Sequence, residues 1–579
     1  MHVGSSDTFD HVVLIETASN QHTIFQTNRL RENIGASELI YRVGTVFVDE
    51  AVKKLEPGSA DIVVRASGKA IVLVRGRTNA EAIIRDVTLR TLLECPGVVA
   101  RGAHAEIKGP SAKDLDNAIR EAHRLVNEVA SRLPPPQARF QRLPFVENCA
   151  SSSYPAAALN WKASRDGNAP AHSEVIFARR DGKVRAEAHE RIGKITKAPL
   201  AQSLDAFEEA SEDGTIGDWI AIVHADGNGL GQVFLNFVDR IEKDASADDY
   251  VKALKGFSSA VDDWSRAAAG KAIEETWGDI KKKIEDREKT GKGRKYFLPV
   301  APVVLGGDDL TVICEGERAV RFAAAYIRAF EDVSREALAG DLGKLVPNIG
   351  MDFVAVAAGI AIVKPHFPFH RAYELAEELT GSAKAAKKHF KEIPCSALDF
   401  QVVFDSSGGK LEPIRDRLIL EDADKTKTSL TMRPYVVTPQ ERLEAATDEA
   451  KEWAERRHYS EGERSLLCAV AALLKKPDPD KERGDDAFLP RSQAHALREA
   501  IYLGRKVADG RLAQIHHRYP NFAWESLTGN SRSLFVDDGT WKDEEGNEHR
   551  LVGTYLLDAM DLADLAGQAA LEPLAASDQ

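Results

Sequence analysis

The chain repeats one order of predicted strands and helices. Residues 11–133 alternate short apolar runs with longer amphipathic segments, in the order βαββαβ followed by one more helix. The same order returns from Asp218, where DWIAIVHA predicts a buried strand. A spacing of ~200 residues is far longer than the ~20–50 residues of solenoid repeats. We therefore interpret the pattern as duplication of a whole ferredoxin-like domain.

The two copies differ most at their central hairpins. In the first copy, residues 25–55 are predicted to be helical with an interruption at Gly35, and the next hairpin turns at Ser67-Gly68-Lys69. In the second copy, the hairpin is FLPVAPVVLGGDDLTVIC. Beyond about Pro439 the pattern is helical, and a second Gly-Asp-Asp at residues 484–486 has the charged, proline-rich flanks of a solvated loop. The predicted fold class is α+β, with two ferredoxin-like domains, a connecting module and a C-terminal helical domain.

Composition limits the partners and the compartment. Lys and Arg number 77 against 90 Asp and Glu, giving a net charge of −13, so a nucleic-acid partner needs a local basic patch. The cysteines lie far apart without a CxxC pair, which is typical of a reducing compartment. No signal peptide opens the sequence, and no stretch reaches the ~18 apolar residues of a membrane helix. We expect a cytoplasmic protein that does not contact membranes.

The turn of the second hairpin carries a doubled negative charge. Gly306 and Gly307 allow a tight turn between buried strands, and Asp308 and Asp309 follow directly. Taken alone, this is also the composition of an ordinary Asp-rich turn. Because side chains alternate across a strand, we expect the two aspartates to point to opposite faces. Two like charges close together in a dry site raise each other's pKa or need a cation.

A second acidic motif strengthens the metal interpretation. The buried strand of the second copy ends in Asp226, and a glycine-rich segment leads into a helix. In a ferredoxin-like sheet this strand lies beside the hairpin, so Asp226 can meet Asp308 or Asp309 and hold one or two Mg²⁺ or Mn²⁺ ions. The residues expected to approach the phosphates of a nucleotide are Gly227, Asn228, Gly229, Gly231, Gly306 and Gly307.

A basic helix face completes the predicted site. Lys384, Lys387 and Lys388 stand three and four positions apart in the predicted helix 370–390, opposite its apolar face. Such a face is usually only solvated. Beside a carboxylate site, Lys384 and Lys388 become candidates for binding phosphate.

Together these motifs resemble the polymerase-like large subunit of type III CRISPR effector complexes, a two-palm family related to GGDEF-type nucleotide cyclases. The similar segments, which fall within about residues 10–440, are IFQTNRLRENIGASEL (24–39), CASSSYPA (149–156), ADGNGLG (225–231), LPVAPVVLGGDDL (298–310) and AAGIAIVKPHFPFHRAYELAEEL (357–379). The resemblance implies the following domains: 1–133, a degenerate first palm; 134–200, a connecting module; 201–438, the catalytic palm with a charged insert around 240–296; and 439–579, a helical C-terminal domain.

The resemblance also implies an activity. It predicts synthesis of cyclic oligoadenylates from ATP as second messengers in antiviral defence, with Asp226, Asp308 and Asp309 as catalytic and metal-binding residues. Lys384 follows an alanine, as in the Ala-Lys step of GGDEF-type cyclases, and is the phosphate candidate. The first palm has Glu16 and Ser67-Gly68-Lys69 where active palms carry aspartates. We therefore expect it to be inactive and to complete the nucleotide pocket.

Other departures from the family affect cofactors and partners. The chain has no His-Asp dipeptide, so a histidine-aspartate nuclease is not expected. The family's central zinc module needs several cysteines, and Cys149 alone lies in that region, which speaks against zinc. The basic run at residues 280–295, in the charged insert, is either a nucleic-acid contact or a solvated loop.

Three functions remain open from the sequence. The chain is a cyclic oligonucleotide synthase, or a scaffold that binds guide RNA, target RNA and other CRISPR effector subunits, or a template-dependent polymerase, although no fingers or thumb regions accompany the hairpin. A stand-alone antiphage cyclase is a further form of the first function, and that form is compatible with a homo-oligomer. Product ring size, base preference and activator are not encoded in any recognisable motif.

Overall fold

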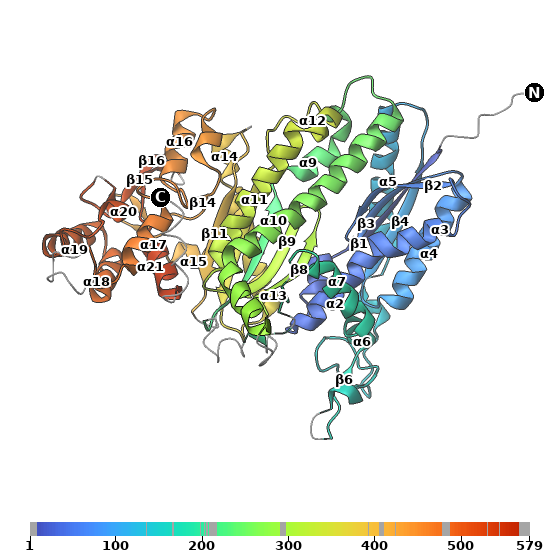
Figure 1. The fold of residues 1–579 in the computed structure, drawn as a ribbon, viewed down its shortest axis with the longest axis horizontal. Helices are drawn as coiled ribbons and strands as arrows, with labels where there is room; N and C mark the ends of the chain where they lie inside the picture. The colour runs from blue at the N-terminus through green and yellow to red at the C-terminus, as the bar shows by residue number, and fades with distance from the viewer. Residues whose placement is uncertain are drawn as a thin grey trace, which may run out of the picture.

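The computed structural model describes residues 9–566, apart from 135, 165–166, 197, 202, 204–205, 208–216, 290–296, 392, 405–409, 423, 478–486, 530 and 543–544. The molecule is elongated, and the chain passes from the first sheet through a second sheet to a smaller C-terminal unit at the far end (Figure 1). The second Gly-Asp-Asp lies outside the described residues. None of the described helices is both long and apolar enough to span a membrane.

The first sheet has the strand order β2-β3-β1-β4, with antiparallel pairing throughout. Its elements are β1 (His11–Ala18), α1 (Asn20–Ile24), α2 (Leu30–Arg42), η1 (Val43–Phe47), α3 (Val48–Lys53), β2 (Ala60–Ala66), β3 (Lys69–Val74), α4 (Arg77–Glu94), β4 (Val99–Glu106) and α5 (Ala112–Arg132). The helix runs through Gly35, so the predicted interruption there is wrong. A Cβ at Gly35 would lie 2.0 Å from the Arg179 carbonyl oxygen, so this glycine serves close packing. The irregular turn is the π-helical segment η1 instead.

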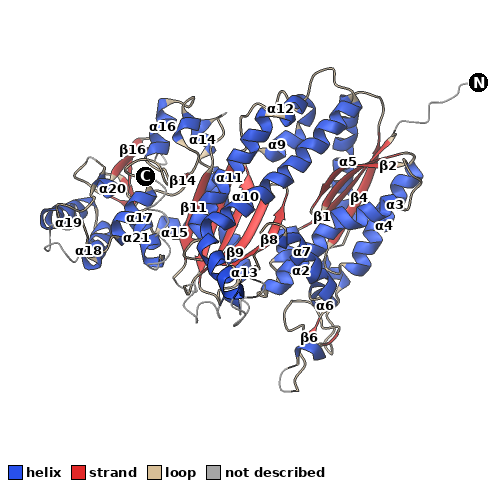
Figure 2. Ribbon diagram, in the orientation of Figure 1, coloured by secondary structure: helices blue, strands red, loops and turns tan. Residues whose placement is uncertain are grey.

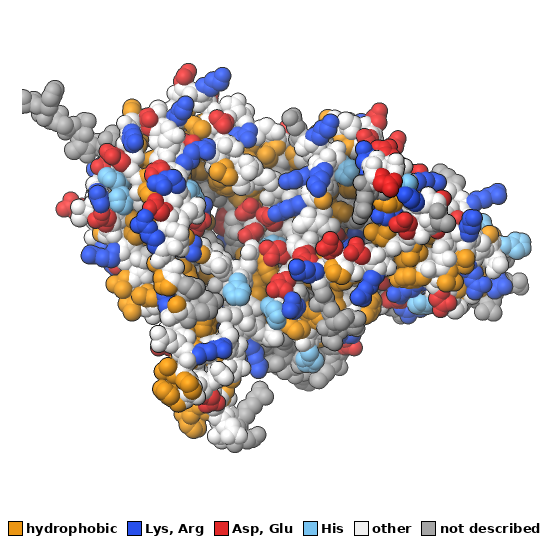
Figure 3. Space-filling view, turned by 180° about the vertical axis from the view of Figure 1, so that it is seen from behind, with side chains coloured by type: hydrophobic (Ala, Val, Ile, Leu, Met, Phe, Trp, Pro, Cys, Tyr) orange, Lys and Arg blue, Asp and Glu red, His pale blue; other side chains and the backbone are white. Residues whose placement is uncertain are grey.

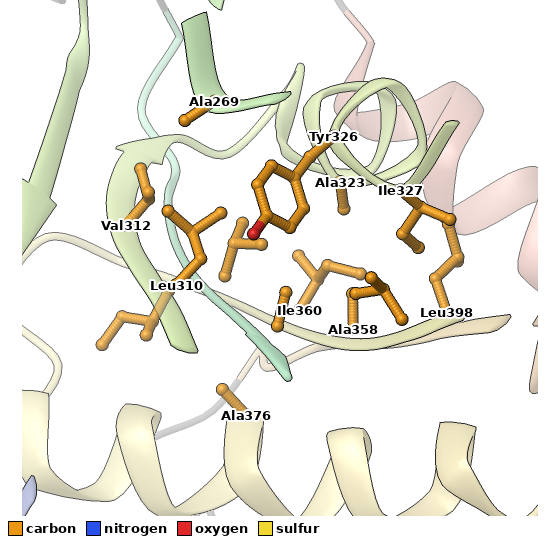
Figure 4. Close-up of a cluster of buried hydrophobic side chains, with 14 of the residues drawn as sticks. Ala269, Leu310, Val312, Ala323, Tyr326, Ile327, Ala358, Ile360, Ala376 and Leu398 are labelled. Carbon is orange, nitrogen blue, oxygen red and sulfur yellow. The ribbon is translucent and has the colours of Figure 1, made fainter. Parts of the chain in front are cut away.

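The second sheet repeats this order as β8-β9-β7-β10 and extends it by two strands, β11 and β14. Its elements are β7 (Ile220–Gly227), α9 (Leu230–Leu235), η4 (Phe237–Arg240), α10 (Ala247–Lys289), β8 (Val300–Gly306), β9 (Asp309–Glu315), α11 (Ala319–Ala339), α12 (Asp341–Leu345), β10 (Val356–Val363), α13 (Phe369–Lys384), α14 (Lys387–Phe390), β11 (Ala397–Val402) and β14 (Tyr435–Val436). Every residue of β10 is buried, because Tyr326 and Ala323 of α11 cover one side of the sheet and Ala376 of α13 the other (Figure 4). The predicted α+β class with two ferredoxin-like domains is confirmed.

The segment predicted to be a charged insert is a regular part of the second domain. Residues 247–289 form the long helical segment α10, kinked at Trp277, which is the crossover between the first two strands of the second domain. Its charges lie on its exposed side, whereas Phe257, Trp264 and Trp277 are buried in the core. The sequence pattern failed here because a dense run of lysines at the helix end hides the apolar period upstream.

Two further units complete the chain. The connecting module contains η2 (Pro136–Arg139), β5 (Ala158–Leu159), η3 (Trp161–Ala163), β6 (Ala171–His172), α6 (Glu174–Arg179) and α7 (Gly182–Gly193). It projects below the two sheets (Figure 1), and apolar side chains gather on the projecting tip (Figure 3).

The C-terminal region is not only helical, contrary to the prediction. A third sheet with the order β12-β13-β16-β15 lies among its helices (Figure 2). The elements are α15 (Leu411–Asp416), β12 (Ile419–Glu421), β13 (Lys427–Ser429), η5 (Gln440–Leu443), α16 (Asp448–Glu455), α17 (Leu466–Leu474), α18 (Arg491–Tyr502), α19 (Arg505–Arg518), α20 (Glu525–Thr528), β15 (Val536–Lys542), β16 (Glu548–Gly553) and α21 (Leu556–Leu565). Because β13 pairs with β16, residues 419–429 join this unit across the expected boundary at 439.

The two ferredoxin-like domains pack reciprocally. Helix α10 of the second domain contacts β2 of the first, and α2 of the first contacts β8 of the second. An ion pair of 2.6 Å joins Lys255 Nζ to Asp61 across this interface. The hairpin tips also meet, because a Cβ at Gly306 would lie 3.7 Å from the Ser67 Cβ. The first hairpin therefore lies against the site formed by the second.

Candidate active site at the second hairpin

Three aspartates come together where β7 ends and β9 begins. Asp226 and Asp309 are direct cross-strand partners, and Asp308 lies in the turn between β8 and β9. One carboxylate oxygen from each lies within 4.8 Å of the others. The expectation that Asp308 and Asp309 face opposite sides is wrong. Asp308 belongs to the turn, where Gly307 has a φ of 63°, so the alternation of a strand does not apply to it.

The carboxylates are in an unfavourable environment without a cation. Burial, followed by the charges of Asp308 and Glu377, raises the pKa of Asp309 to about 7. Burial also raises the pKa of Asp308, although the nearby Lys69 opposes this. Three half-buried carboxylates at this distance supply the hard oxygen ligands that Mg²⁺ and Mn²⁺ prefer, so the residues present fit a divalent cation.

Lys384 is the predicted lysine that reaches the aspartates. It is the last residue of α13 and forms an ion pair with Asp226. Helix α13 sits directly on the sheet, because a Cβ at Gly359 of β10 would lie 2.1 Å from the Ala376 carbonyl oxygen. The Thr380 hydroxyl also donates to the His224 carbonyl oxygen at 3.1 Å. Burial, with a smaller contribution from Lys387, lowers the pKa of Lys384.

The structure separates Lys388 from this lysine. Helix α13 ends at Lys384 and α14 starts at Lys387, so the predicted basic face of one continuous helix is wrong. Lys388 is exposed on α14, and among the described residues no ion pair joins it to the aspartates.

The predicted glycines surround the aspartates. A Cβ at Gly227 would lie 3.0 Å from the Asp308 Cβ, so a side chain there would push the turn away. A Cβ at Gly229, Gly231 or Gly307 would meet nothing within 4 Å, which leaves open space beside the site. The Asn228 N–H donates to the Ala355 carbonyl oxygen at 2.7 Å. The Asn228 side-chain oxygen is buried and has no hydrogen-bond partner among the described groups.

Two residues of the site were missed by the sequence prediction. The Asp262 carboxylate on α10 accepts a hydrogen bond of 3.2 Å from the Gly307 N–H and so holds the turn. Lys69, in the hairpin of the first domain, is close enough to Asp308 to oppose the rise in its pKa. Asp262 is adjacent to no recognisable motif. Lys69 ends the turn Ser67-Gly68-Lys69 that the sequence marked, but its approach to Asp308 comes only from the packing of the two domains.

Lys69 occupies an informative position. In the first sheet Glu16 pairs with Lys69, as Asp226 pairs with Asp309 in the second. Glu16 and Lys69 form an ion pair of 4.0 Å. At the register positions where the second domain has Asp226 and Asp309, the first domain thus has an acid, Glu16, and a base, Lys69. The base also lies near the aspartates of the second domain.

Metal binding should depend on pH. A carboxyl whose pKa is raised to about 7 keeps its proton below that pH, and the proton competes with the cation. Affinity for Mn²⁺ should therefore fall about tenfold between pH 8 and pH 6, with proton release on binding near pH 7. Calorimetric titrations at about pH 6 and pH 8 in two buffers measure both quantities. In Asp309→Asn the pH dependence should become weaker, and equal affinities for the unaltered protein at both pH values would contradict the assignment.

Comparison with known proteins identifies the domain that contains the site. Residues 219–391 match the family model "Cas10/Cmr2, second palm domain". No curated protein matches the chain.

Similar solved structures include an apo Csm1-Csm4 cassette, with 12% identity and a TM-score of 0.41, covering 67% of this chain and 55% of that one. A Csm1-Csm4 cassette in complex with cA4 has 12% identity and a TM-score of 0.39, with coverage of 65% and 53%. A third, in complex with AMPPNP, has 13% identity and a TM-score of 0.39, with coverage of 65% and 53%. The chain thus spans little more than half the length of these solved chains. Residues 219–391 are therefore similar to the second palm domain of Cas10/Cmr2, which confirms over this segment the resemblance to the large subunit of type III CRISPR effector complexes that the sequence predicted.

Proposed function

We propose that the chain joins ATP molecules into cyclic oligoadenylates, as a metal-dependent nucleotidyltransferase of antiviral defence. The observation that carries the proposal is the meeting of Asp226, Asp308 and Asp309 at one hairpin of a Cas10-type palm, with Lys384 and Lys69 beside them. We propose ATP and Mg²⁺ or Mn²⁺ as substrate and cofactor, and other CRISPR effector subunits with guide or target RNA as partners.

The roles of the residues follow from their positions. Asp226, Asp308 and Asp309 would hold the divalent cations, which in such sites lower the pKa of the attacking ribose hydroxyl and stabilise the leaving pyrophosphate. Lys384 and Lys69 supply positive charge on two sides of the aspartates, where the phosphates of bound ATP would lie. Gly229, Gly231 and Gly307 leave room for those phosphates. Lys388 remains a candidate only for a phosphate outside this group.

The reciprocal packing gives each domain a task. We propose that residues 201–438 act as the catalytic palm and residues 1–133 as an inactive palm that binds the second nucleotide. The meeting of the two hairpin tips at Ser67 and Gly306 supports this division, because a nucleotide bound at one hairpin would lie next to the other. Residues 134–200 and 439–579 are then the parts available to partner subunits.

The test is direct. Purified protein is incubated with ATP and Mn²⁺, alone and with the RNA and subunits that co-purify with it, and the products are identified by mass spectrometry. Cyclic or linear oligoadenylates with release of pyrophosphate are expected. If an active preparation of partners and RNA is present and no nucleotide product forms, the scaffold function replaces this proposal. Extension of a primer on a template would indicate the polymerase instead.

The role of Lys69 can be tested separately. Lys69→Met removes the positive charge that the first palm supplies but leaves the aspartates intact, so activity should fall about 10–100-fold, the range for groups that support metal ligands. The KM for ATP should rise more than kcat falls if Lys69 binds phosphate. Lys255→Met, which breaks an ion pair at the same domain interface, is the matched control and should change activity little. Equal losses in both variants would reduce Lys69 to an interface residue.

A further inference from the structure

A cleft of about 1470 Å³ lies apart from the aspartate site. Its walls include residues 28–31 at the start of α2, residues 159–163, 168–170 and 172 of the connecting module, residues 180–182 and 185 around the start of α7, and residues 365–367 and 369 around the start of α13. A smaller pocket of about 140 Å³ shares Arg31, Arg185 and Ser203 with it. Typical small-molecule sites measure ~300–1,000 Å³, so this cleft is large enough for an extended ligand.

The cleft is locally basic in an acidic protein. Arg29, Arg31, Lys162 and Arg185 line it, in addition to Arg180, which is ion-paired with the buried Glu32. Its acidic lining residue is Asp181, whose carboxylate accepts hydrogen bonds from the Lys183 and Val184 N–H groups at 2.9 and 3.2 Å.

One of these cations has an unused donor. The Arg185 Nε is buried and has no hydrogen-bond partner among the described groups. His189 lies beside Arg185 in the smaller pocket, and burial followed by the charge of Arg185 lowers the pKa of His189. A buried donor beside further cations is the environment that a phosphate group satisfies.

Flat apolar surfaces lie among these cations. Trp161 lines the cleft with 67% of its surface exposed, which is unusual for the largest apolar side chain. Phe177 and Phe367 line the same cleft. Cationic side chains that follow a backbone, interleaved with aromatic rings on which bases stack, are the two features of grooves that bind single strands. An acidic peptide would use the charges but not the exposed rings.

We propose that this cleft binds a single-stranded nucleic acid. Backbone phosphates would contact Arg29, Lys162 and Arg185, and a base would stack on Trp161. The basic run of α10 is a weaker site for the same ligand, because Lys281 there is already paired with Glu274 at 2.6 Å. The inference does not depend on the proposed synthesis of oligoadenylates, since the aspartate site contributes none of the lining residues.

The test is fluorescence anisotropy with the full chain and a labelled single-stranded RNA of about 12 nucleotides, within the site sizes of single-strand grooves. Trp161→Ala should weaken binding about tenfold through loss of one stacked base. Arg29→Glu and Arg185→Glu should each lower the slope of log K against log salt by about 0.7 for a lost phosphate contact. The matched controls are Phe145→Ala, an exposed aromatic of the same module outside the cleft, and Lys506→Glu on α19. Both should bind as the unaltered protein does.

The outcomes separate the proposal from its alternatives. Binding of RNA alone, or of RNA and single-stranded DNA alike, supports a single-strand site, and the first result adds recognition of the 2′-hydroxyl. Equal binding of double-stranded RNA overturns it, as does unchanged affinity in both Trp161→Ala and Arg29→Glu. Displacement of the RNA by ATP with Mn²⁺ would place the strand at the aspartate site and also overturn the proposal. Because the measurement needs no catalysis, it can fail while oligoadenylate synthesis stands, and the reverse.

Discussion

Replacing Asp308 and Asp309 by asparagine should abolish product formation, with a loss of at least about 1,000-fold in kcat/KM. Removal of one preorganised electrostatic contact costs ~10²–10³ in rate, and here two of the three ligands of the proposed metal site lose their charge. Side-chain volume hardly changes, so the hairpin and its contact with the Asp262 carboxylate should persist. Activity is measured as pyrophosphate released from ATP in the presence of Mn²⁺.

In the absence of metal, the folded state should be more stable after replacement of these aspartates than in the unaltered protein. Burial and the charge of Asp308 raise the pKa of Asp309, so the ionised pair destabilises the folded state above about pH 7. A neutral amide removes that repulsion, and the metal-free Asp309→Asn protein should unfold at a higher temperature than the unaltered one at pH 8. Asp341→Asn, an exposed acid of α12, is the control and should change neither quantity. Full activity in the double variant would exclude these aspartates from the reaction.

Replacing Arg433 by methionine should cost about 3–5 kcal/mol of unfolding free energy, the range for breaking a buried ion pair from one side. Arg433 is buried between the second palm and α21, where its guanidinium contacts Asp558 at 2.7 Å and Asp561 at 3.1 Å. It also donates to the Gln401 side chain of β11 at 3.2 Å. Without it, two carboxylates remain buried at the junction, and the C-terminal unit should detach first.

The loss of unfolding free energy in Arg433→Met should depend on pH. Burial raises the pKa of Asp561 to about 6, so stability attached to its protonated form is present at low pH and lost as pH rises through that value. Arg433→Met should therefore be more destabilised at pH 8 than at pH 5. Urea unfolding, with limited proteolysis to report release of the C-terminal unit, measures this. Arg498→Met removes a part-exposed cation 3.9 Å from the same Asp561, and should cost at most about 1 kcal/mol. Equal effects of the two variants would show that the buried network does not hold the unit.

The central strands of both palms could be predicted because their residues are buried on both faces and read as apolar runs. Strand β10 is buried throughout, and β7 is nearly so. The hairpin at Gly307 followed from turn chemistry, and the approach of Asp226 followed from the strand order. The strands and the hairpin are recognisable from the local sequence pattern, so no tertiary contact had to be known to predict them.

What the sequence did not reveal depends on contacts between distant segments. Asp262 joins the site from a crossover helix, with nothing in its neighbourhood to mark it. Lys69 lies in the turn Ser67-Gly68-Lys69 that the sequence marked, but it comes near Asp308 only through the packing of the two domains. The C-terminal sheet was missed because β12 and β13 are three residues each and because β13 pairs with β16, a strand more than a hundred residues away. Helix α10 was read as an insert because its lysine-rich end lacks an apolar period.

The acid–base pair of Glu16 and Lys69 has a consequence for the order of events between the palms. Two equivalent acidic hairpins facing each other would make the two sides of the interface functionally the same, since a bound dinucleotide could react from either end. Because the first hairpin carries Glu16 and Lys69 at the register positions where the second carries Asp226 and Asp309, the two sides of the interface differ in charge. On the proposed function, chain growth would therefore run in one direction. Ring closure would then require the product to reverse its orientation between the two unequal hairpins.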